Sequence, residues 1–217
     1  WKELGDPPNV WRCRDNPSCR LLLGGPEAAR PAEFDGPLVE RLRARAETAD
    51  RDVQWSYATL PVTWEIATTE PDYAAYDVVV HIGLGVYDRT DTVFVEDGAY
   101  NGRRGTDAAG RSIDAPISTA LTGDVLAVPA ASPIAQRVAD IDGRTFGGYR
   151  VEVKAARREN AFLCNETHFV ALQAVHDSVA DGGRLQQAYF VHIPFADNED
   201  YAALADGIAG VVAALVL

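Results

Sequence analysis

The sequence lacks the features that mark several large protein classes. Acidic residues outnumber basic ones by 32 to 20, which gives a formal net charge of −12, and no long Lys/Arg cluster is present. Surfaces that bind nucleic acid or anionic lipid are usually basic, so we expect neither partner. The only near-continuous apolar segment, residues 208–217, is far too short to cross a bilayer. These absences argue against a nucleic-acid-binding or membrane-spanning protein.

Methionine is absent and cysteine is scarce. Because the sequence opens at Trp1 without a methionine, we expect its natural start to lie before this residue, and a removed leader is left open. The three cysteines are Cys13, Cys19 and Cys164. Cys13 and Cys19 bracket a short polar loop and could close a disulfide, which would indicate secretion; two free thiols in a reducing cytosol are the alternative. No further Cys or His is spaced for a zinc motif, and we expect no metal or other cofactor.

The apolar patterning predicts an α/β protein. A chain of 217 residues with 47% hydrophobic residues can bury a full core and is most simply one domain. We expect an irregular polar arm over residues 1–19, a single α/β domain over residues 20–217 and a loop at 101–111. Strands are predicted at 20–23, 53–62, 76–83, 92–99, 148–153 and 188–194, and helices at 38–49, 64–69, 133–141, 163–180 and 199–217. This alternation favours a three-layer α/β/α sandwich with a mostly parallel central sheet.

Residues 159–165 (ENAFLCN) join a predicted strand to a predicted helix. Cys164 then lies in the first helical turn, where unpaired backbone N–H groups and the positive end of the helix dipole favour a thiolate. The thiolate is the nucleophilic form of cysteine, so Cys164 is the leading candidate nucleophile. A buried structural thiol is the alternative interpretation.

Two further polar residues stand at the ends of predicted strands, where open α/β sheets bind their ligands. His192 ends the last apolar strand, and Glu96 ends the apolar run 92–96. Cysteine hydrolysis needs a thiol, a histidine that takes its proton and later protonates the leaving amine, and a carboxylate that orients the histidine. Taken singly, His192 also fits a packed core histidine and Glu96 a solvent-facing carboxylate.

Five short segments carry a recognisable pattern. They are residues 60–62 (LPV), 76–84 (YDVVVHIGL), 96–101 (EDGAYN), 162–165 (FLCN) and 190–194 (FVHIP). In this order they resemble pyroglutamyl peptidase I, also called pyrrolidone-carboxylate peptidase, over roughly residues 20–200. The resemblance implies an α/β/α hydrolytic domain with Cys164 as nucleophile, His192 as general base and then acid, and Glu96 as the orienting carboxylate.

The same resemblance implies an activity and its partners. The chain would be a cysteine exopeptidase that removes an N-terminal pyroglutamyl (5-oxoprolyl) or related cyclic or capped residue through a thioester intermediate. Its substrate would be a peptide with a blocked N-terminus, contacted by Phe162, Leu163, Gly24, Gly25 and Asn101. The family is cytoplasmic, and a homo-oligomer is left open.

One departure from the family bears on the substrate. The family has aromatic residues in the turn after its first strand, whereas residues 24–30 (GGPEAAR) contain none. Losing such a wall costs about 1–3 kcal/mol of apolar contact per ring. Two alternatives therefore stay open: a repurposed, non-enzymatic peptide-binding member of the same fold, or a cysteine amidase that acts on another small amide.

Two residues of the predicted helix 163–180 offer competing interpretations. Asn165 begins a formal N-glycosylation acceptor, Asn-Glu-Thr, but it lies beside Cys164, so we interpret the match as chance. His168 follows Cys164 by four residues. We expect its ring to point away from the substrate side of the thiol, which leaves His192 as the preferred base.

Overall fold

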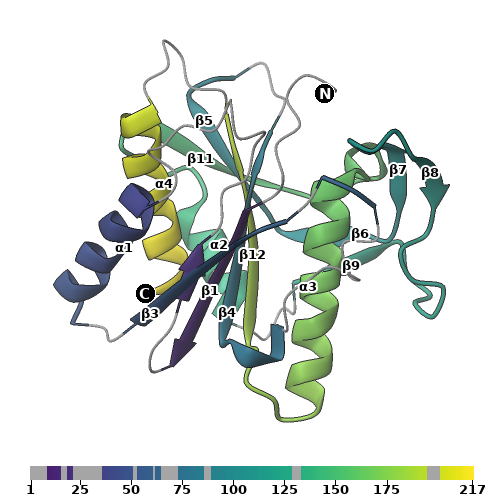
Figure 1. Cartoon of the computed structure of the whole chain (residues 1–217), viewed down its shortest axis with the longest axis horizontal. Helices are drawn as coiled ribbons and strands as arrows, with labels where there is room; N and C mark the ends of the chain where they lie inside the picture. Colours follow the sequence, from purple (N-terminus) through teal and green to yellow (C-terminus); the bar gives the residue numbers. More distant parts are fainter. Residues whose placement is uncertain are drawn as a thin grey trace.

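The computed structural model of the chain describes residues 9–15, 19–21, 36–50, 53–60, 62–64, 73–85, 89–128, 133–194 and 201–217. Its main-sheet strands are β1 Asn9–Asp15, β2 Cys19–Leu21, β3 Val53–Thr59, β4 Val78–Leu84, β5 Thr92–Glu96, β10 Thr145–Phe146, β11 Tyr149–Lys154 and β12 Gln187–Ile193. They form a sheet in the order β10-β11-β5-β12-β4-β1-β2-β3 (Figure 1).

The central sheet is mixed and mostly parallel, as predicted. β4 and β12 at its centre are parallel, as are β5 and β11, whereas β12 and β5 pair antiparallel. Following the ladders outward, β2, β3, β4, β10 and β12 share one direction and β1, β5 and β11 oppose them. The β-branched run of β4 is buried on both faces, which is typical of a strand at the centre of an α/β sheet.

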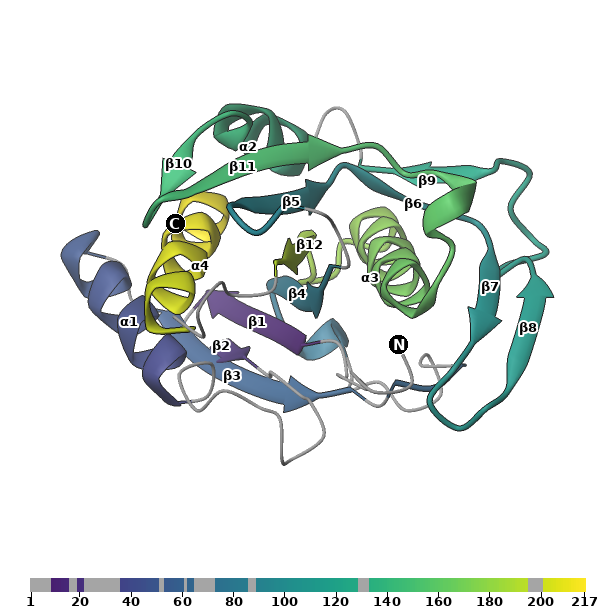
Figure 2. The same cartoon turned by 90° about the horizontal axis from the view of Figure 1, so that it is seen from above.

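Helices cover both faces of the sheet and confirm the three-layer sandwich. α1 (Gly36–Thr48) packs against α4 (Tyr201–Val216), and α2 (Pro133–Ile141) packs against α4 and β11. α3 (Leu163–Ala180) lies on the opposite face from α1 and α4 (Figure 2). Among the described residues, no helix combines the length and the apolar character that crossing a membrane would require.

Two small sheets lie beside α3. β6 (Gly98–Tyr100) pairs with β9 (Val125–Ala127), and β7 (Arg103–Thr106) pairs with β8 (Ser112–Ala115). Both pairs lie on the α3 side of the molecule, and β7 and β8 extend beyond the helix (Figure 2). Through these two small sheets, the segment that follows β5 reaches the start of α3.

The helices predicted at 38–49, 133–141, 163–180 and 199–217 are confirmed as α1, α2, α3 and α4. The predicted helix at 64–69 lies almost wholly outside the described residues. Each confirmed helix has a local apolar stripe; in α1, for example, the stripe Leu38, Val39, Leu42 and Ala46 is buried.

Three local predictions are wrong, two of them because a strand pairs with a partner distant in sequence and the third because the predicted loop contains one arm of a short hairpin. The supposed irregular arm contains β1, which pairs with both β3 and β4. The single strand predicted at 92–99 is broken at Asp97, after which β6 pairs with β9 in another sheet. The loop predicted at 101–111 contains β7, whose partner β8 follows Gly110. The division of the chain into residues 1–19 and 20–217 stays a prediction.

Candidate active site

Cys164 is the second residue of α3. The chain reaches the helix through a short 3-10 turn, η4 (Arg158–Asn160), and Phe162 occupies the N-cap position with extended backbone and no side-chain cap. The first-turn N–H groups of a helix have no intrahelical acceptor, so they are available to an anionic oxygen near the thiol. The Cys164 thiol is free and half-buried.

The structure brings His192 and Glu96 together beside this thiol. Their strands, β12 and β5, are neighbours in the sheet, and His192 Nδ1 lies 3.0 Å from Glu96 Oε1. The imidazole also hydrogen-bonds with the Cys164 side chain. Glu96 is 7% exposed and His192 8% exposed, so the carboxylate holds the ring in a site largely closed to water. Three residues far apart in sequence thus form one connected set.

The charge of His192 is set by these two partners. Burial by itself would lower the pKa of His192, but hydrogen bonds to Cys164 and Glu96, together with the negative charge of each, raise it to about 9. At neutral pH the raised pKa favours the imidazolium form of His192, held between the Cys164 sulfur and the Glu96 carboxyl group.

Gly83, which has no side chain, leaves space beside β4 for the Cys164 thiol. It pairs with His192 across β4 and β12. A Cβ placed at Gly83 would lie 3.2 Å from Cys164 Sγ and 2.9 Å from Phe190 Cζ. The contact with Phe190 is closer than Cβ atoms normally come and the contact with Sγ is tight, so a side chain at this position would push on both the ring and the thiol. Sequence reasoning missed this role, although a glycine ending a buried strand is a signal of close approach.

The structural role of Asn165 could not be predicted from its sequence context. Its Oδ1 accepts a hydrogen bond from the Tyr100 N–H at 2.8 Å, and its Nδ2 donates to the Tyr100 and Gly102 carbonyls at 2.8 and 2.9 Å. The side-chain amide thereby hydrogen-bonds with the backbone of β6 in the way that the backbone of a neighbouring strand would. It fixes the segment just after Glu96 to the helix that carries Cys164.

Asn165→Ala is expected to destabilise the protein by about 2–3 kcal/mol, since three hydrogen bonds are lost and Tyr100 and Gly102 keep unpaired backbone groups. Urea unfolding followed by circular dichroism measures the loss. Gln173→Ala removes an exposed amide from the same helix and is the matched control, with an expected change within about 0.5 kcal/mol. Equal unfolding midpoints for the two variants would contradict the anchoring role of Asn165.

The predicted substrate-binding residues have different surroundings. Phe162 meets Trp64 edge-to-face, with ring centroids 5.4 Å apart, and Leu163 packs in the same small apolar cluster. The amide of Asn101 is engaged by its own loop, since Oδ1 accepts from the Ile117 and Ser118 N–H groups and Nδ2 donates to the Ser118 carbonyl. Gly24 and Gly25 lie outside the described residues, as do the side chains of Cys13 and Cys19.

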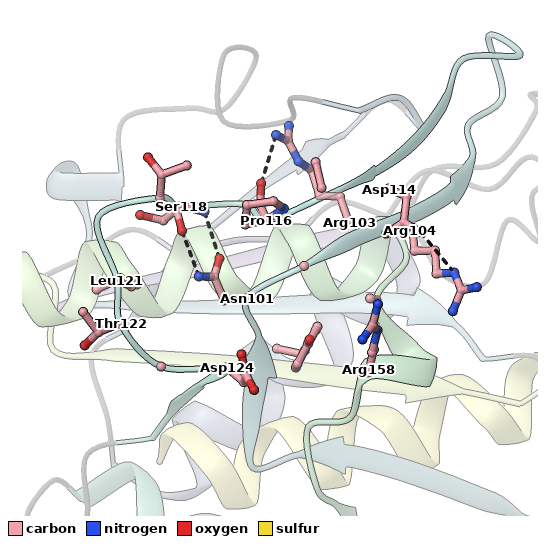
Figure 3. A pocket seen from close by; sticks show the side chains of 16 residues that line it. Asn101, Arg103, Arg104, Asp114, Pro116, Ser118, Leu121, Thr122, Asp124 and Arg158 are labelled. Atoms are coloured by element: carbon pink, nitrogen blue, oxygen red, sulfur yellow. Dashed lines mark hydrogen bonds and ion pairs between the residues drawn. The ribbon is translucent and has the colours of Figure 1, made fainter.

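Asn101 also lines a polar cavity of about 540 Å³, formed by the ends of β6, β7 and β8 and the loop after them (Figure 3). Cys164, His192 and Glu96 are not among its lining residues. Arg103, on its wall, reaches the buried Glu166 of α3 at 3.4 Å and so ties β7 to the helix. In the part of the chain that the structure describes, no group of three or more His, Cys, Asp or Glu side chains is arranged to hold a metal ion.

Comparison with known proteins gives a match in structure only. No protein-family model and no curated sequence matches the chain. Among solved structures, pyrrolidone carboxyl peptidase from Thermococcus litoralis matches with a TM-score of 0.51 and 20% identity, over 80% of this chain and 83% of that one. The Pyrococcus furiosus enzyme of the same name matches with a TM-score of 0.52 and 20% identity, over 74% and 81%. This chain shares their fold. At such identities the likeness is one of fold alone.

Proposed function

We propose that this chain is a cysteine exopeptidase that removes an N-terminal pyroglutamyl residue from peptides. The observation that carries the proposal is the connected set Cys164–His192–Glu96 at the start of α3. A fold shared with pyrrolidone carboxyl peptidases supports the choice of substrate. The blocked amino acid would be the acyl group, and the rest of the peptide would leave as an amine.

The reaction follows from the charges of this set. The Cys164 thiolate attacks the carbonyl carbon of the 5-oxoprolyl amide, and backbone N–H groups in the first turn of α3 donate hydrogen bonds that stabilise the negative charge developing on the oxygen. The imidazolium of His192 protonates the leaving nitrogen, the C–N bond breaks and a thioester remains. Neutral His192 then takes a proton from water as the water attacks the thioester, which releases 5-oxoproline and restores the thiolate. Glu96 stays ionised and holds the ring throughout.

The acyl group of this substrate is a small uncharged lactam, which needs an apolar contact. The wall adjoining Cys164 is apolar: Leu163 is buried, and the ring of Phe162 is supported by Trp64 and by Gly105, where a Cβ would come within 2.9 Å of the ring. Support from two sides fixes the Phe162 ring. We assign the ring contact with the lactam to Phe162, in place of the aromatic residues that the turn 24–30 lacks.

A fluorogenic pyroglutamyl amide tests the proposal. The expected result is release of the fluorophore that is abolished by prior treatment with iodoacetamide. Thiol-sensitive hydrolysis of other small amides without activity on the pyroglutamyl substrate would point to the amidase alternative. Binding of blocked peptides without hydrolysis would point to the non-enzymatic one.

The pH dependence of kcat/KM is expected to be bell-shaped. As pH rises through about 9, His192 loses the proton that it must give to the leaving amine, so the rate should fall tenfold per pH unit beyond that point. On the acid side the rate falls as the thiolate is protonated. The profile is measured on the free enzyme at low substrate concentration. A rate that stays constant from about pH 5 to pH 10 would contradict a histidine in this role.

A further inference from the structure

His168 is a buried imidazole that the proposed reaction does not use. It lies on α3 one turn after Cys164 and is only 1% exposed. Its ring packs on Phe190, with centroids 5.8 Å apart and the planes at 61°. Neither ring nitrogen has a hydrogen-bond partner among the residues that the structure describes. The ring is thus in the protein interior beside β12.

An unpaired buried polar group is costly, so its presence needs a reason. Its neighbours on the buried side of α3 include Phe169, Leu172 and Val175, and an apolar side chain would therefore suit this position. Burial, with a smaller contribution from the positive charge of His192, lowers the pKa of His168 to about 3. The ring is neutral wherever the enzyme would work, and its two nitrogens remain available to respond to a nearby charge.

That charge is the imidazolium of His192. The Phe190 ring contacts both imidazoles, with centroids 5.8 Å from His168 and 4.7 Å from His192. The positive charge of His192 also contributes to the lowered pKa of His168, which is consistent with the two rings sharing Phe190 as a neighbour. In a buried site, a neutral imidazole can adopt the tautomer and orientation that best stabilise a neighbouring ion. It then acts on that ion as a bound solvent molecule would.

We propose that His168 is a positioning residue that acts through His192: its neutral imidazole directs a ring nitrogen's lone pair toward the imidazolium and stabilises the charged Cys164–His192 pair. The inference rests on the proposed nucleophile pair, but not on the identity of the substrate. In this role, His168 replaces the solvation by water that the His192 imidazolium loses on burial.

Other titratable or charged groups around this pair hold fixed positions. They are Glu96 on β5, with Asp97 and Lys154 behind it, His81 on β4 with its partner Tyr73, and Glu166 on α3 with its partner Arg103. Glu96 is held by His192 Nδ1, and the Nε2 atom of His81 is held by the Tyr73 hydroxyl at 3.0 Å. Their fields act equally on the wild type and on variants of His168, so a change at residue 168 reports the contribution of that ring.

The test is the pH dependence of alkylation at Cys164. Iodoacetamide reacts with the thiolate, and mass spectrometry of the peptide that contains Cys164 separates it from Cys13 and Cys19. Three variants are compared with the wild type from about pH 4 to pH 10. His168→Phe removes the dipole and keeps a ring, His168→Asn keeps a dipole, and His176→Phe makes the same exchange on α3 where the ring reaches only the Ala127 carbonyl at 3.4 Å.

For His168→Phe we expect the profile to move to higher pH, with a rate near pH 6 that is about three- to tenfold lower than in the wild type. His168→Asn should retain most of the wild-type rate, and His176→Phe should coincide with the wild type. Circular dichroism and thermal unfolding establish that each variant is folded, and His168→Leu replaces His168→Phe if the larger ring is not accommodated. Coincident profiles for wild type and the folded apolar variant would overturn the proposal. Equal displacement in His168→Asn and His168→Phe would also overturn it, because packing would then explain the effect.

The readout needs no peptide substrate, so the two proposals can fail separately. If the wild type ignores pyroglutamyl amides while His168→Phe displaces the alkylation profile, the proposed function fails and the role of His168 stands. If pyroglutamyl amides are hydrolysed and the alkylation profile is unchanged, the function stands and the role of His168 fails.

Discussion

Cys164→Ala is expected to lower kcat/KM for a pyroglutamyl amide by at least about 10⁴-fold, because no other group in the site can form the thioester. The hydrogen bond between Cys164 and His192 is lost, but the fold should be kept, since the thiol is half-buried and α3 is held by Leu163, Phe169 and Leu172. The effect is measured from initial rates at several substrate concentrations. The enzyme is purified a second time to remove contaminants that hydrolyse the substrate.

Val179→Ala is the matched control for this experiment. Val179 lies on the same helix and is 53% exposed, so its truncation should leave both the rate and the unfolding temperature within error of the wild type. A folded Cys164→Ala variant that hydrolyses the substrate at a rate near that of the wild type would show that the nucleophile lies elsewhere.

Glu96→Gln is expected to lower kcat by about 10²–10⁴-fold with little change in shape. The amide can still reach His192 Nδ1, but it carries no charge, and its NH₂ group favours the wrong tautomer of the ring. Removal of the charge and hydrogen bond that raise the pKa of His192 also moves the alkaline limb of the rate profile to lower pH. Rates measured across pH report both effects.

Glu152→Gln is the matched control. It tests whether the loss of any carboxylate on a strand would lower kcat and move the alkaline limb of the rate profile. Glu152 lies on the neighbouring strand β11, where it pairs with Arg89 at 2.8 Å rather than with a histidine. We expect the activity and alkaline limb of this variant to match the wild type. An alkaline limb that stays in place in Glu96→Gln would contradict the orienting role of Glu96.

The parts of the fold that the sequence predicted well are those specified locally. α2 and α3 begin and end at the expected residues, because each has an apolar stripe of helical period and a clear boundary. The residues of the candidate site could likewise be selected before the structure, since Cys164 begins a helix and His192 and Glu96 end apolar strands. Their residue types and positions suggested that the three side chains lie together. The hydrogen bonds of His192 describe how they are arranged.

Other features depend on packing between elements that are distant in sequence. β1 carries three charged residues among its seven, and it forms a strand because β3 and β4 both pair with it. The need for glycine at residue 83 arises only when α3 places a sulfur on β4. The burial of His168 depends on where Phe190 lies under α3. No local pattern contains this information, so these roles became visible only in three dimensions.

The central claim is that Cys164 forms a covalent bond with the acyl group of the substrate. With an activated 5-oxoprolyl ester, whose leaving group is good, acylation is expected to be faster than hydrolysis of the thioester, so an acid quench during turnover should trap the intermediate. Mass spectrometry of the quenched protein is predicted to show one added 5-oxoprolyl group on the peptide that contains Cys164, and none in Cys164→Ala. Turnover of the ester with Cys164 unmodified, or with the group attached to another residue, would contradict the account.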